Sequence, residues 1–249
     1  MATERIYGLI GYPLEHSFSK TYFTEKFQRE HLDGCTYDNF PIPDIELFPD
    51  ILKNPKLSGL NVTIPYKEQV IPYLSELDPV AREIGAVNVI RIARDNGRVI
   101  CTGFNTDAYG FETSLTPLLS VKHTTALVLG TGGAAKAVIY VLNKLGMKVT
   151  LAGRTANASR IPFEQVNEKL IREHLLVVNT TPLGMHPNTE GIPPLPYHAL
   201  SSDHVLYDLV YNPSETRFLL EGKKAGCKTE NGLKMLHLQA EKAWETWNR

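Results

Sequence analysis

The chain has 249 residues, of which 43% are hydrophobic, and its 26 basic and 27 acidic residues leave a net charge of −1. A chain of this size and composition can bury a sizeable core, either as one large domain or as two smaller ones. A near-neutral charge without a long basic run excludes the electrostatic footprint that binding to nucleic acid or to an anionic membrane surface requires.

Cysteine usage and hydropathy indicate in which cellular compartment the protein is expected. Cys35, Cys101 and Cys227 are far apart, odd in number and contain no CxxC pair, which argues against a disulfide framework and against a thiolate zinc site. The apolar stretch at the amino terminus is too short for a signal-peptide core, and no later window approaches the roughly 20 apolar residues of a membrane helix. We therefore expect a soluble, unprocessed, cytoplasmic protein without a bound metal.

Short β-rich runs alternate with helix-like stretches, which predicts an α/β fold with mainly parallel sheets. In the first part of the chain, strands are expected near residues 5–10, 36–40, 59–64 and 87–93, and helices near residues 20–30, 45–53 and 66–74. The stretch 106–119 then carries apolar residues at helical spacing, and we expect it to join this unit to a second one.

The pattern restarts at residue 125. It predicts a strand over 125–129, a helix over 134–145, and strands over 148–151, 175–178 and 205–210. An amphipathic helix is expected over 233–247, where it could pack back onto the first unit. We therefore predict a first domain of residues 1–104 plus 233–249 and a second domain of residues 105–232.

A glycine-rich turn lies between the strand and the helix that open the second unit. Residues 130–135, GTGGAA, fit the pattern G-x-G-x-x-A in the context in which it binds a pyrophosphate. Gly130 permits the tight turn, Gly132 lets the main chain approach the phosphates, and the helix amino terminus supplies unbonded N–H donors. The same pattern also fits an ordinary tight turn of a doubly wound sheet or a methyltransferase turn, so its context carries the prediction.

The end of the following strand bears on the type of cofactor. An NAD site usually has an Asp or Glu there, whereas this chain has Gly153-Arg154-Thr155. The Arg154 guanidinium can bind a 2′-phosphate through two N–H groups, and Thr155 can add a hydroxyl donor. This favours NADP over NAD, although an arginine after a strand is also commonly a solvated surface residue.

Polar side chains interrupt the apolar pattern of the first unit. In the predicted strand 59–64, Asn61 and Thr63 project from one face at the carboxyl end, where ligands of α/β sheets bind. Lys67 follows in the first helical turn, which is an unfavourable place for a cation and therefore suggests function. A solvated surface lysine is the simpler interpretation of the same residue.

Further polar residues are ambiguous one by one. Asn88 lies inside an apolar strand and needs hydrogen-bond partners if it is buried. Asp107 could simply favour the positive amino terminus of a helix, Ser19 could cap one, and Ser17 could be an ordinary loop hydroxyl. None of these residues decides a function by itself.

Taken together, these segments resemble the shikimate dehydrogenase family. The similar stretches are GYPLEHSFS at 11–19, GLNVTIPYK at 59–67, GAVNV at 85–89, GFNTDAYGF at 103–111, GTGGAAKA at 130–137, NTTPLGM at 179–185, DLVYNPSETRFL at 208–219 and NGLKMLHLQA at 231–240. The resemblance implies two α/β domains facing across a cleft, a mostly parallel substrate-binding domain followed by a Rossmann-like NADP-binding domain. It implies the reversible NADPH-dependent reduction of 3-dehydroshikimate to shikimate, in the biosynthesis of chorismate and the aromatic amino acids.

The resemblance also implies roles for individual residues. Lys67 and Asp107 would be catalytic, with Asp107 orienting the ammonium and keeping it charged, and Lys67 acting either as the proton donor or as an electrostatic stabiliser. The substrate-binding residues that it implies are Ser17, Ser19, Thr63, Asn88, Tyr211 and Gln239. The implied cofactor-binding residues are Gly130, Thr131, Gly132, Gly133, Ala134, Arg154, Thr155, Leu209 and Gly232.

The sequence departs from the family pattern at a few positions. Gly153 stands where an asparagine is usual, which removes one amide from the 2′-phosphate site and is expected to weaken NADP binding. Lys20 replaces a common proline, and Val89 a usual threonine. The segment between Thr155 and Asn179 is short, which predicts a trimmed second half of the nucleotide-binding domain. A quinate/shikimate dehydrogenase that uses both NAD and NADP, and a non-catalytic nucleotide-sensing module, are the alternatives, and the chain could be a monomer or a homodimer.

Overall fold

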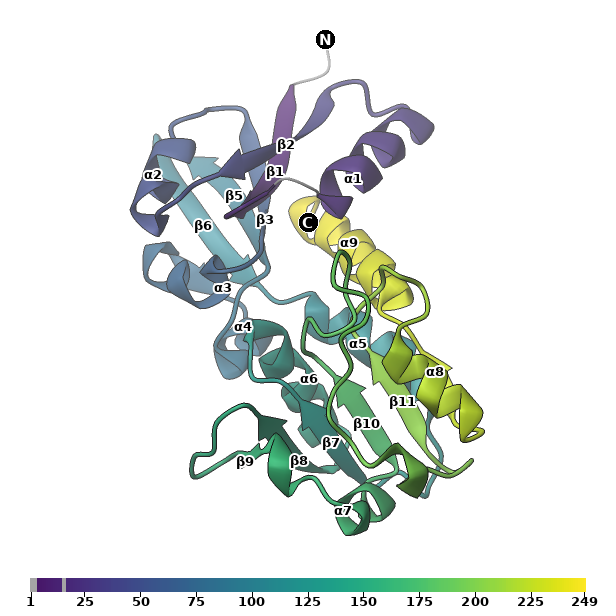
Figure 1. Ribbon diagram of the computed structural model, residues 1–249. Coiled ribbons are helices and arrows are strands. Elements are labelled where there is room, and N and C mark those ends of the chain that lie inside the picture. Colours follow the sequence, from purple (N-terminus) through teal and green to yellow (C-terminus); the bar gives the residue numbers. More distant parts are fainter. Residues whose placement is uncertain (1–3, 15–16) are drawn as a thin grey trace. The chain divides into compact units, whose positions relative to one another are not determined.

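The chain forms two units, each built around one sheet (Figure 1). The structure is a computed structural model that describes residues 4–14 and 17–249. Unit 1 comprises Met1–Thr106 and Ala240–Arg249, and unit 2 comprises Asp107–Gln239. The division therefore falls inside the helix α9 (Leu233–Trp247). The assignment of substrate binding to the predicted domain 1–104 plus 233–249, and of cofactor binding to the predicted domain 105–232, stays a prediction.

Unit 1 contains a mixed six-stranded sheet with the order β2-β1-β3-β5-β6-β4. Its strands are β1 (Arg5–Gly11), β2 (Cys35–Pro41), β3 (Leu57–Val62), β4 (Glu76–Leu77), β5 (Val89–Asp95) and β6 (Arg98–Phe104). β1 is parallel to β2 and β3, and β4 is parallel to β6, but β5 is antiparallel to both of its neighbours. The antiparallel pairing arises because Asn96 and Gly97, both with positive φ, join β5 to β6 in a two-residue hairpin.

The connections of unit 1 contain mostly short helical segments. They are α1 (Phe18–Arg29), α2 (Phe48–Ile51), α3 (Tyr66–Gln69) and α4 (Pro79–Ile84), with 3-10 turns at Ile45–Leu47 and Ile71–Tyr73. The helices predicted near 45–53 and 66–74 are therefore present only as short pieces. Pro49 and Pro72 explain the difference, because neither can donate a backbone hydrogen bond to the preceding turn.

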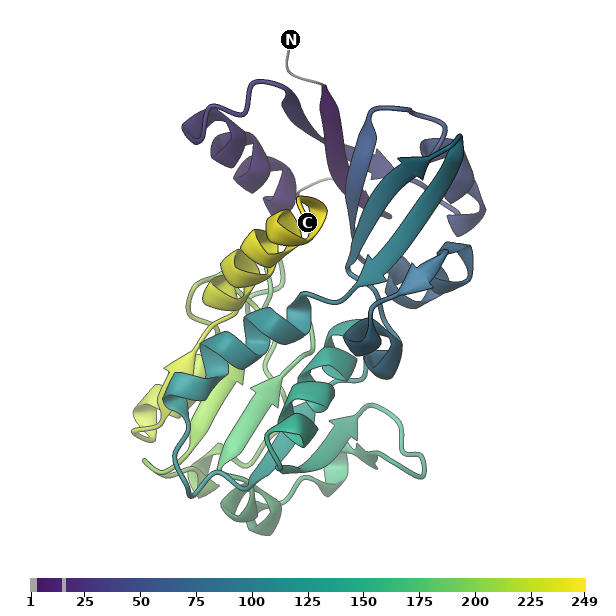
Figure 2. The same cartoon turned by 180° about the vertical axis from the view of Figure 1, so that it is seen from behind.

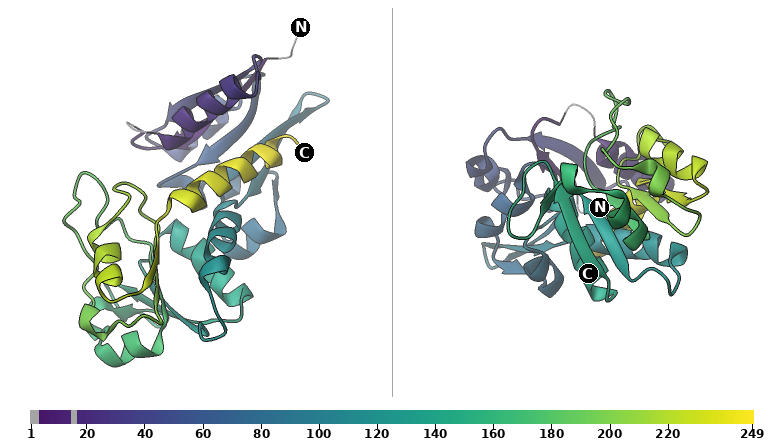
Figure 3. Two further views of the ribbon diagram at one scale, coloured as in Figure 1. Left: turned by 90° about the vertical axis from the view of Figure 1, so that its right-hand side faces the viewer. Right: turned by 60° about the horizontal axis from the view of Figure 1, so that its bottom comes forward.

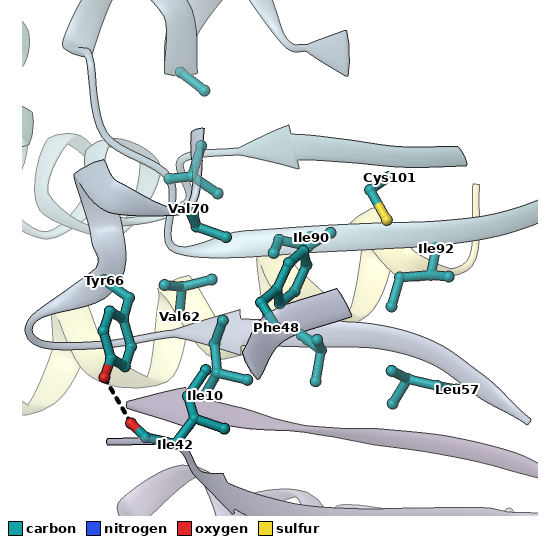
Figure 4. Close-up of a cluster of buried hydrophobic side chains, with 13 residues drawn as sticks. Ile10, Ile42, Phe48, Leu57, Val62, Tyr66, Val70, Ile90, Ile92 and Cys101 are labelled. Carbon is teal, nitrogen blue, oxygen red and sulfur yellow. Dashed lines mark hydrogen bonds between the residues drawn. The ribbon is translucent and has the colours of Figure 1, made fainter. Parts of the chain in front are cut away.

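Hydrophobic clusters cover both faces of this sheet. Figure 4 shows one cluster, in which Phe48 and Tyr66 pack over β3 and β5 and the Tyr66 hydroxyl donates to the carbonyl of Ile42 at 2.6 Å. On the other face, α1 lies along the sheet (Figure 3, left) and contributes Phe23 and Phe27 to a second cluster. The part of α9 that belongs to unit 1 completes this second cluster with Ala240, Ala243 and Trp247.

Gly59 of β3 lies directly under the indole of Trp247. A Cβ at position 59 would overlap the indole ring, so only glycine fits here. The indole stacks on Tyr7 with ring centroids 4.9 Å apart and tilts against Phe23 at 5.2 Å. Its Nε1 also donates to the carbonyl of Ile90 at 3.0 Å. The missing side chain of Gly59 therefore lets the end of α9 rest on the sheet.

Unit 2 contains an all-parallel six-stranded sheet with the order β12-β11-β10-β7-β8-β9. Its strands are β7 (Thr125–Leu129), β8 (Lys148–Gly153), β9 (Ile161–Pro162), β10 (Leu176–Asn179), β11 (Val205–Asp208) and β12 (Lys228–Glu230), and its further helices are α5 (Asp107–Leu115), α6 (Gly133–Lys144), α7 (Glu168–Glu173) and α8 (Arg217–Lys224). α5 and α6 lie side by side over one face of this sheet (Figure 2), and α8 covers the other face (Figure 1).

The strand order of unit 2 is that of a doubly wound, Rossmann-like sheet. Counted along the chain, its strands are arranged 6-5-4-1-2-3, so the order reverses between β7 and β10 and leaves a crevice position at their carboxyl ends. The segment after Thr155 is short, and its strand β9 has only two residues. β9 is nevertheless present as the third strand of the sheet in chain order. Among the described residues, no helix combines the length and the hydropathy that crossing a membrane would require.

We predict that Gly59→Ala destabilises the protein by about 1–3 kcal/mol, because the added methyl overpacks the cluster around Trp247. Displacement of the indole should also break its hydrogen bond to Ile90. Urea unfolding followed by tryptophan fluorescence measures both effects. Ser58→Ala in the same strand is the control, and equal stability of the two variants would contradict this account of the packing.

Candidate functional site

In unit 1, Thr63, Lys67 and Asn88 are tied together at the carboxyl end of β3. The Thr63 amide donates to the carbonyl of Ile10 at 2.9 Å, which keeps the residue in line with the neighbouring strand β1. The carbonyl of Lys67 accepts from the amide of Val87 at 2.7 Å, and the carbonyl of Asn88 accepts from Val62 at 2.9 Å. Backbone hydrogen bonds therefore fix the three predicted residues to one edge of the sheet.

The Asn88 side chain is 3% exposed and finds its partners in the backbone and hydroxyl of Thr106. Its Oδ1 accepts from the Thr106 amide at 2.7 Å, and its Nδ2 donates to the Thr106 Oγ1 at 3.1 Å. A buried amide without such partners would cost a large part of its hydration energy. Asn88 thus holds the chain at the residue that directly precedes Asp107.

A buried hydrogen-bond chain continues from Asn88 toward α1. Asn61 Nδ2 donates to the carbonyl of Asn88 at 3.5 Å, and Asn61 Oδ1 accepts from the Tyr37 hydroxyl at 2.7 Å. Burial raises the pKa of Tyr37, and a hydrogen bond with the Ser19 side chain offsets part of this rise. The predicted residue Ser19 is therefore linked through Tyr37 and Asn61 to Asn88.

Ser17 caps α1. Its Oγ accepts from the backbone amide of Lys20 at 3.1 Å, and because the hydroxyl accepts this bond, its own O–H remains a donor. A proline at position 20 could not make this bond, so the departure at Lys20 strengthens the cap. Glu15 and His16 of the stretch 11–19 lie outside the described residues.

In unit 2, Asp107 and Gln239 come from neighbouring helices and are 7% and 8% exposed. Asp107 opens α5, and one turn later a Cβ at Gly110 would lie 2.6 Å from the carbonyl of Met235 and 3.2 Å from the Cβ of Gln239. The helices α5 and α9 can approach this closely only because position 110 has no side chain. The approach brings the predicted residues Asp107 and Gln239 to adjoining turns.

The glycine turn has the features that an anion-binding turn needs. Gly130 has φ +106°, and a Cβ there would lie 2.5 Å from Thr180 Oγ1, so glycine is required at this position. No atom comes within 4 Å of a Cβ built on Gly132, which leaves the main chain open to a ligand. α6 begins at Gly133, and no side chain caps its first turn, so amide donors of the predicted residues Thr131–Ala134 lie at an uncapped helix amino terminus.

The end of β8 lies beside this turn. The Gly130 amide donates to the carbonyl of Ala152 at 2.9 Å, and β7 and β8 pair in parallel up to Leu129 and Ala152. Gly153 is buried, whereas Arg154 and Thr155 are exposed just beyond the strand. The structure thus brings the predicted turn and the predicted arginine to the same edge of the sheet.

A buried carboxylate that the sequence analysis missed links the loops after β10 and β11. Asp208 is fully buried and accepts from Thr216 Oγ1 at 2.5 Å, Asn179 Nδ2 at 3.0 Å and the Val210 amide at 3.0 Å. Burial raises the pKa of Asp208 to about 6, and the three hydrogen bonds offset part of the effect. An aspartate within the otherwise apolar run of β11 was the available signal.

The predicted residues Leu209 and Gly232 meet directly beyond this carboxylate. A Cβ at Gly232 would overlap the carbonyl of Leu209, so only glycine lets the two backbones pass. Tyr211 follows β11 and is 37% exposed, and partial burial raises its pKa. Among the described residues, no group of three or more His, Cys, Asp or Glu side chains could hold a metal ion.

Comparison with known proteins identifies the family. Residues 9–90 match the family model described as the shikimate dehydrogenase substrate binding domain. A curated shikimate dehydrogenase (NADP(+)) from Carboxydothermus hydrogenoformans is 40% identical over 260 residues, covering 98% of this chain and 91% of the relative. The chain belongs to the shikimate dehydrogenase family.

Solved structures of the family share the fold of the whole chain. A shikimate dehydrogenase crystallised in complex with NADP+ superposes with a TM-score of 0.87 at 33% identity, covering 98% of this chain and 90% of that one. A quinate dehydrogenase from Corynebacterium glutamicum in complex with NAD also has a TM-score of 0.87, at 27% identity, with 98% and 94% covered. The expected α/β fold with a Rossmann-like second unit is confirmed.

We predict that Asp208→Asn removes a pH dependence of stability between about pH 4 and pH 6. In the unfolded chain this carboxyl ionises near 3.8, whereas in the native state it stays protonated up to about 6. The native state therefore binds more protons in this window, and the stability that Asp208 contributes falls by up to about 3 kcal/mol as the pH rises through it. Urea unfolding of wild type and variant at several pH values measures the difference.

Asp203→Asn is the matched control for this experiment. Asp203 is exposed and paired with Lys122 at 2.9 Å, and that ammonium lowers the pKa of Asp203. Its stabilisation should be lost, not gained, as the pH falls, and the effect should be small. A constant stability difference between wild type and Asp208→Asn from pH 4 to pH 8 would contradict the assignment of a raised pKa to Asp208.

Proposed function

We propose that the chain catalyses the reversible NADPH-dependent reduction of 3-dehydroshikimate to shikimate, a step of aromatic amino-acid biosynthesis. The observation that carries the proposal is the group of Thr63, Lys67 and Asn88 at the carboxyl end of β3, held there by backbone and amide hydrogen bonds. Family membership over nearly the whole chain supports the substrate. The name of the curated relative and the NADP+ in the solved structure support the cofactor.

The residues present fit NADP. The open surroundings of Gly132 and the uncapped start of α6 suit a pyrophosphate, and Arg154 suits a 2′-phosphate. When bound, the nicotinamide of this cofactor donates or accepts the hydride. The other residues proposed to hold the cofactor are Gly130, Thr131, Gly133, Ala134, Thr155, Leu209 and Gly232.

Neutral donors are proposed to bind the carboxylate of the substrate. Ser17, Ser19, Thr63 and Tyr211 would supply hydroxyl groups, and Ser17 keeps its O–H available because its oxygen already accepts the bond from Lys20. Hydroxyl donors hold a carboxylate less strongly than an arginine would, which suits a product that must leave after every turnover. Asn88 and Gln239 would hold ring hydroxyls.

Proton transfer is assigned to Lys67 and Asp107. Reduction of the C3 carbonyl develops negative charge on its oxygen, and that oxygen must receive a proton from a group within about 3 Å. The Lys67 ammonium is the proposed donor, or it stabilises the charge while a water supplies the proton. The Asp107 carboxylate is proposed to orient the ammonium.

Spectrophotometric assay of purified protein with shikimate and NADP+, following reduced nicotinamide absorbance, tests the proposed reaction directly. Quinate is the second candidate substrate because the quinate dehydrogenase with NAD shares the fold at a TM-score of 0.87. Each substrate is therefore combined with each cofactor. Absence of turnover in all four combinations would support a nucleotide-sensing module instead. A cytoplasmic location and a monomeric or homodimeric state stay predictions.

We predict that Lys67→Ala lowers kcat by about 10²–10⁴-fold and changes the KM for shikimate much less, because the ammonium acts on charge that develops during the reaction. Asp107→Asn should lower kcat in the same direction. Steady-state kinetics with saturating NADP+ separates the two parameters.

Lys169→Ala is the control for Lys67→Ala. Lys169 is an exposed residue of α7 whose ammonium lies 3.8 Å from Glu173, so its removal deletes one lysine charge from the surface and should leave both parameters unchanged. An unchanged kcat in Lys67→Ala would remove this residue from the mechanism.

A further inference from the structure

The chain returns to the end of β8 immediately after a tight turn. The Asn157 amide donates to the carbonyl of Arg160 at 3.0 Å, and the Arg160 amide donates back to the carbonyl of Asn157 at 3.3 Å. β9 follows at once and pairs Ile161 with Ala152 of β8. The backbone of Arg160 is therefore anchored beside the last residues of β8.

The aliphatic stem of Arg160 occupies the space that a side chain at position 153 would need. A Cβ on Gly153 would lie 2.9 Å from Arg160 Cδ and 3.1 Å from Thr131 Cγ2. Arg160 thus crosses Gly153 at the corner where the glycine turn and the end of β8 meet. An asparagine at position 153, usual in the family pattern, would have to displace this arginine.

The guanidinium of Arg160 is not neutralised. Its Nη2 donates to the Thr155 Oγ1 at 2.8 Å, which leaves the hydroxyl hydrogen of Thr155 free to point elsewhere as a donor. Over the described ranges 4–14 and 17–249, Arg160 forms no ion pair, and its buried Nε has no hydrogen-bond acceptor. A charged, partly buried group held beside Thr155 and the glycine turn is electrostatically suited to an anion.

We propose that Arg160 is a second guanidinium of the 2′-phosphate site, and that Gly153 is the residue that makes room for it. This inference rests on the proposed use of NADP. Arg160 supplies positive charge and N–H donors in place of the missing amide at position 153. Because the Thr155 oxygen accepts a hydrogen bond from Arg160, the Thr155 O–H is left to donate to the phosphate. Together with Arg154, it favours NADP over NAD, because NAD has no phosphate to pair with either guanidinium. The glycine at position 153 therefore removes one phosphate ligand, the asparagine amide, and makes room for another, the Arg160 guanidinium.

Arg160→Ala tests the proposal through binding alone. The probes are adenosine 2′,5′-bisphosphate, which carries the 2′-phosphate, and adenosine 5′-monophosphate, which lacks it, each titrated calorimetrically into the purified full chain. We expect the affinity for the bisphosphate to fall about 10- to 100-fold and the affinity for the monophosphate to stay within about twofold, as expected for the loss of a charge-assisted contact to one phosphate. An equal loss for both probes, or no loss for the bisphosphate, would overturn the proposal.

Arg172→Ala is the matched control. Arg172 is an exposed arginine of the same unit, paired with Glu168 at 2.7 Å, so this variant also removes one positive charge from unit 2. Its affinity for both probes should equal that of the wild type. A loss for the bisphosphate as large as that of Arg160→Ala would show that net charge alone sets the affinity, and the proposal would fail.

A double-mutant cycle tests the pairing of Gly153 with Arg160. Because an asparagine at 153 displaces Arg160, the change Arg160→Ala should cost much less bisphosphate affinity in the Gly153→Asn background than in the wild type. Additive effects would overturn this pairing.

Kinetics separate this inference from the proposed function. With shikimate, Arg160→Ala should raise the KM for NADP+ at least tenfold more than the KM for NAD+. A wild-type chain that binds the bisphosphate through Arg160 but turns over no substrate would refute the proposed reaction and leave the phosphate site intact. An active enzyme whose ratio of the two KM values is unchanged in Arg160→Ala would refute the phosphate site and leave the reaction intact.

Discussion

A buried amide must find hydrogen-bond partners, and in unit 1 the partners of Asn88 determine how the site is built. Its backbone amide bonds to Phe104 of β6, and its carbonyl accepts from Val62 of β3 and from Asn61. Its side chain bonds to Thr106. Asn88 therefore joins the middle of the sheet to the segment that leads into α5. Backbone hydrogen bonds at the carboxyl end of β3 also position Thr63, which bonds to Ile10, and Lys67, which bonds to Val87 next to Asn88. An apolar residue at position 88 would leave the Thr106 amide without its acceptor, a loss of roughly 1–3 kcal/mol.

Asp208 has the corresponding place in unit 2. Its carboxylate accepts from three donors, Asn179 at the end of β10, Val210 and Thr216, and so ties the loop after β11 to the end of β10. Both units thus fix their strand-end loops through one buried polar side chain with satisfied hydrogen bonds. Such networks hold a geometry more firmly than they stabilise a fold, because desolvation offsets much of what the hydrogen bonds contribute. This suits loops that have to present ligand-binding groups in a set arrangement.

The sequence predicted best where function and local structure use the same residues. The glycine turn at Gly130, the following helix and Arg154 are encoded within one short stretch, so their arrangement could be predicted without knowing the rest of the chain. The apolar pattern of the sequence predicts a strand near 87–93 in a mainly parallel sheet but neither β6 nor the β5–β6 hairpin, although Asn96-Gly97 is a strong two-residue turn signal. The contacts of Asp208 and Arg160 could not be predicted, since their partners lie on other strands or across a turn whose path depends on the folded sheet. The roles of Lys67 and Asp107 came from the family resemblance and await the kinetic test.

The division of α9 between the units has a consequence for synthesis on the ribosome. The segment Asp107–Gln239 can complete its own sheet from contiguous sequence, whereas the aromatic cluster of Tyr7 and Phe23 stays open until Ala240–Trp247 has been translated. Of the two hydrophobic clusters in the part of the chain made first, one therefore closes only when the last residues have been made. During that interval the exposed rings are a target for chaperones and for aggregation. This interval ends when Trp247 packs on Gly59. A change at position 59 should therefore lower the yield of folded protein more than its effect on equilibrium stability alone would suggest.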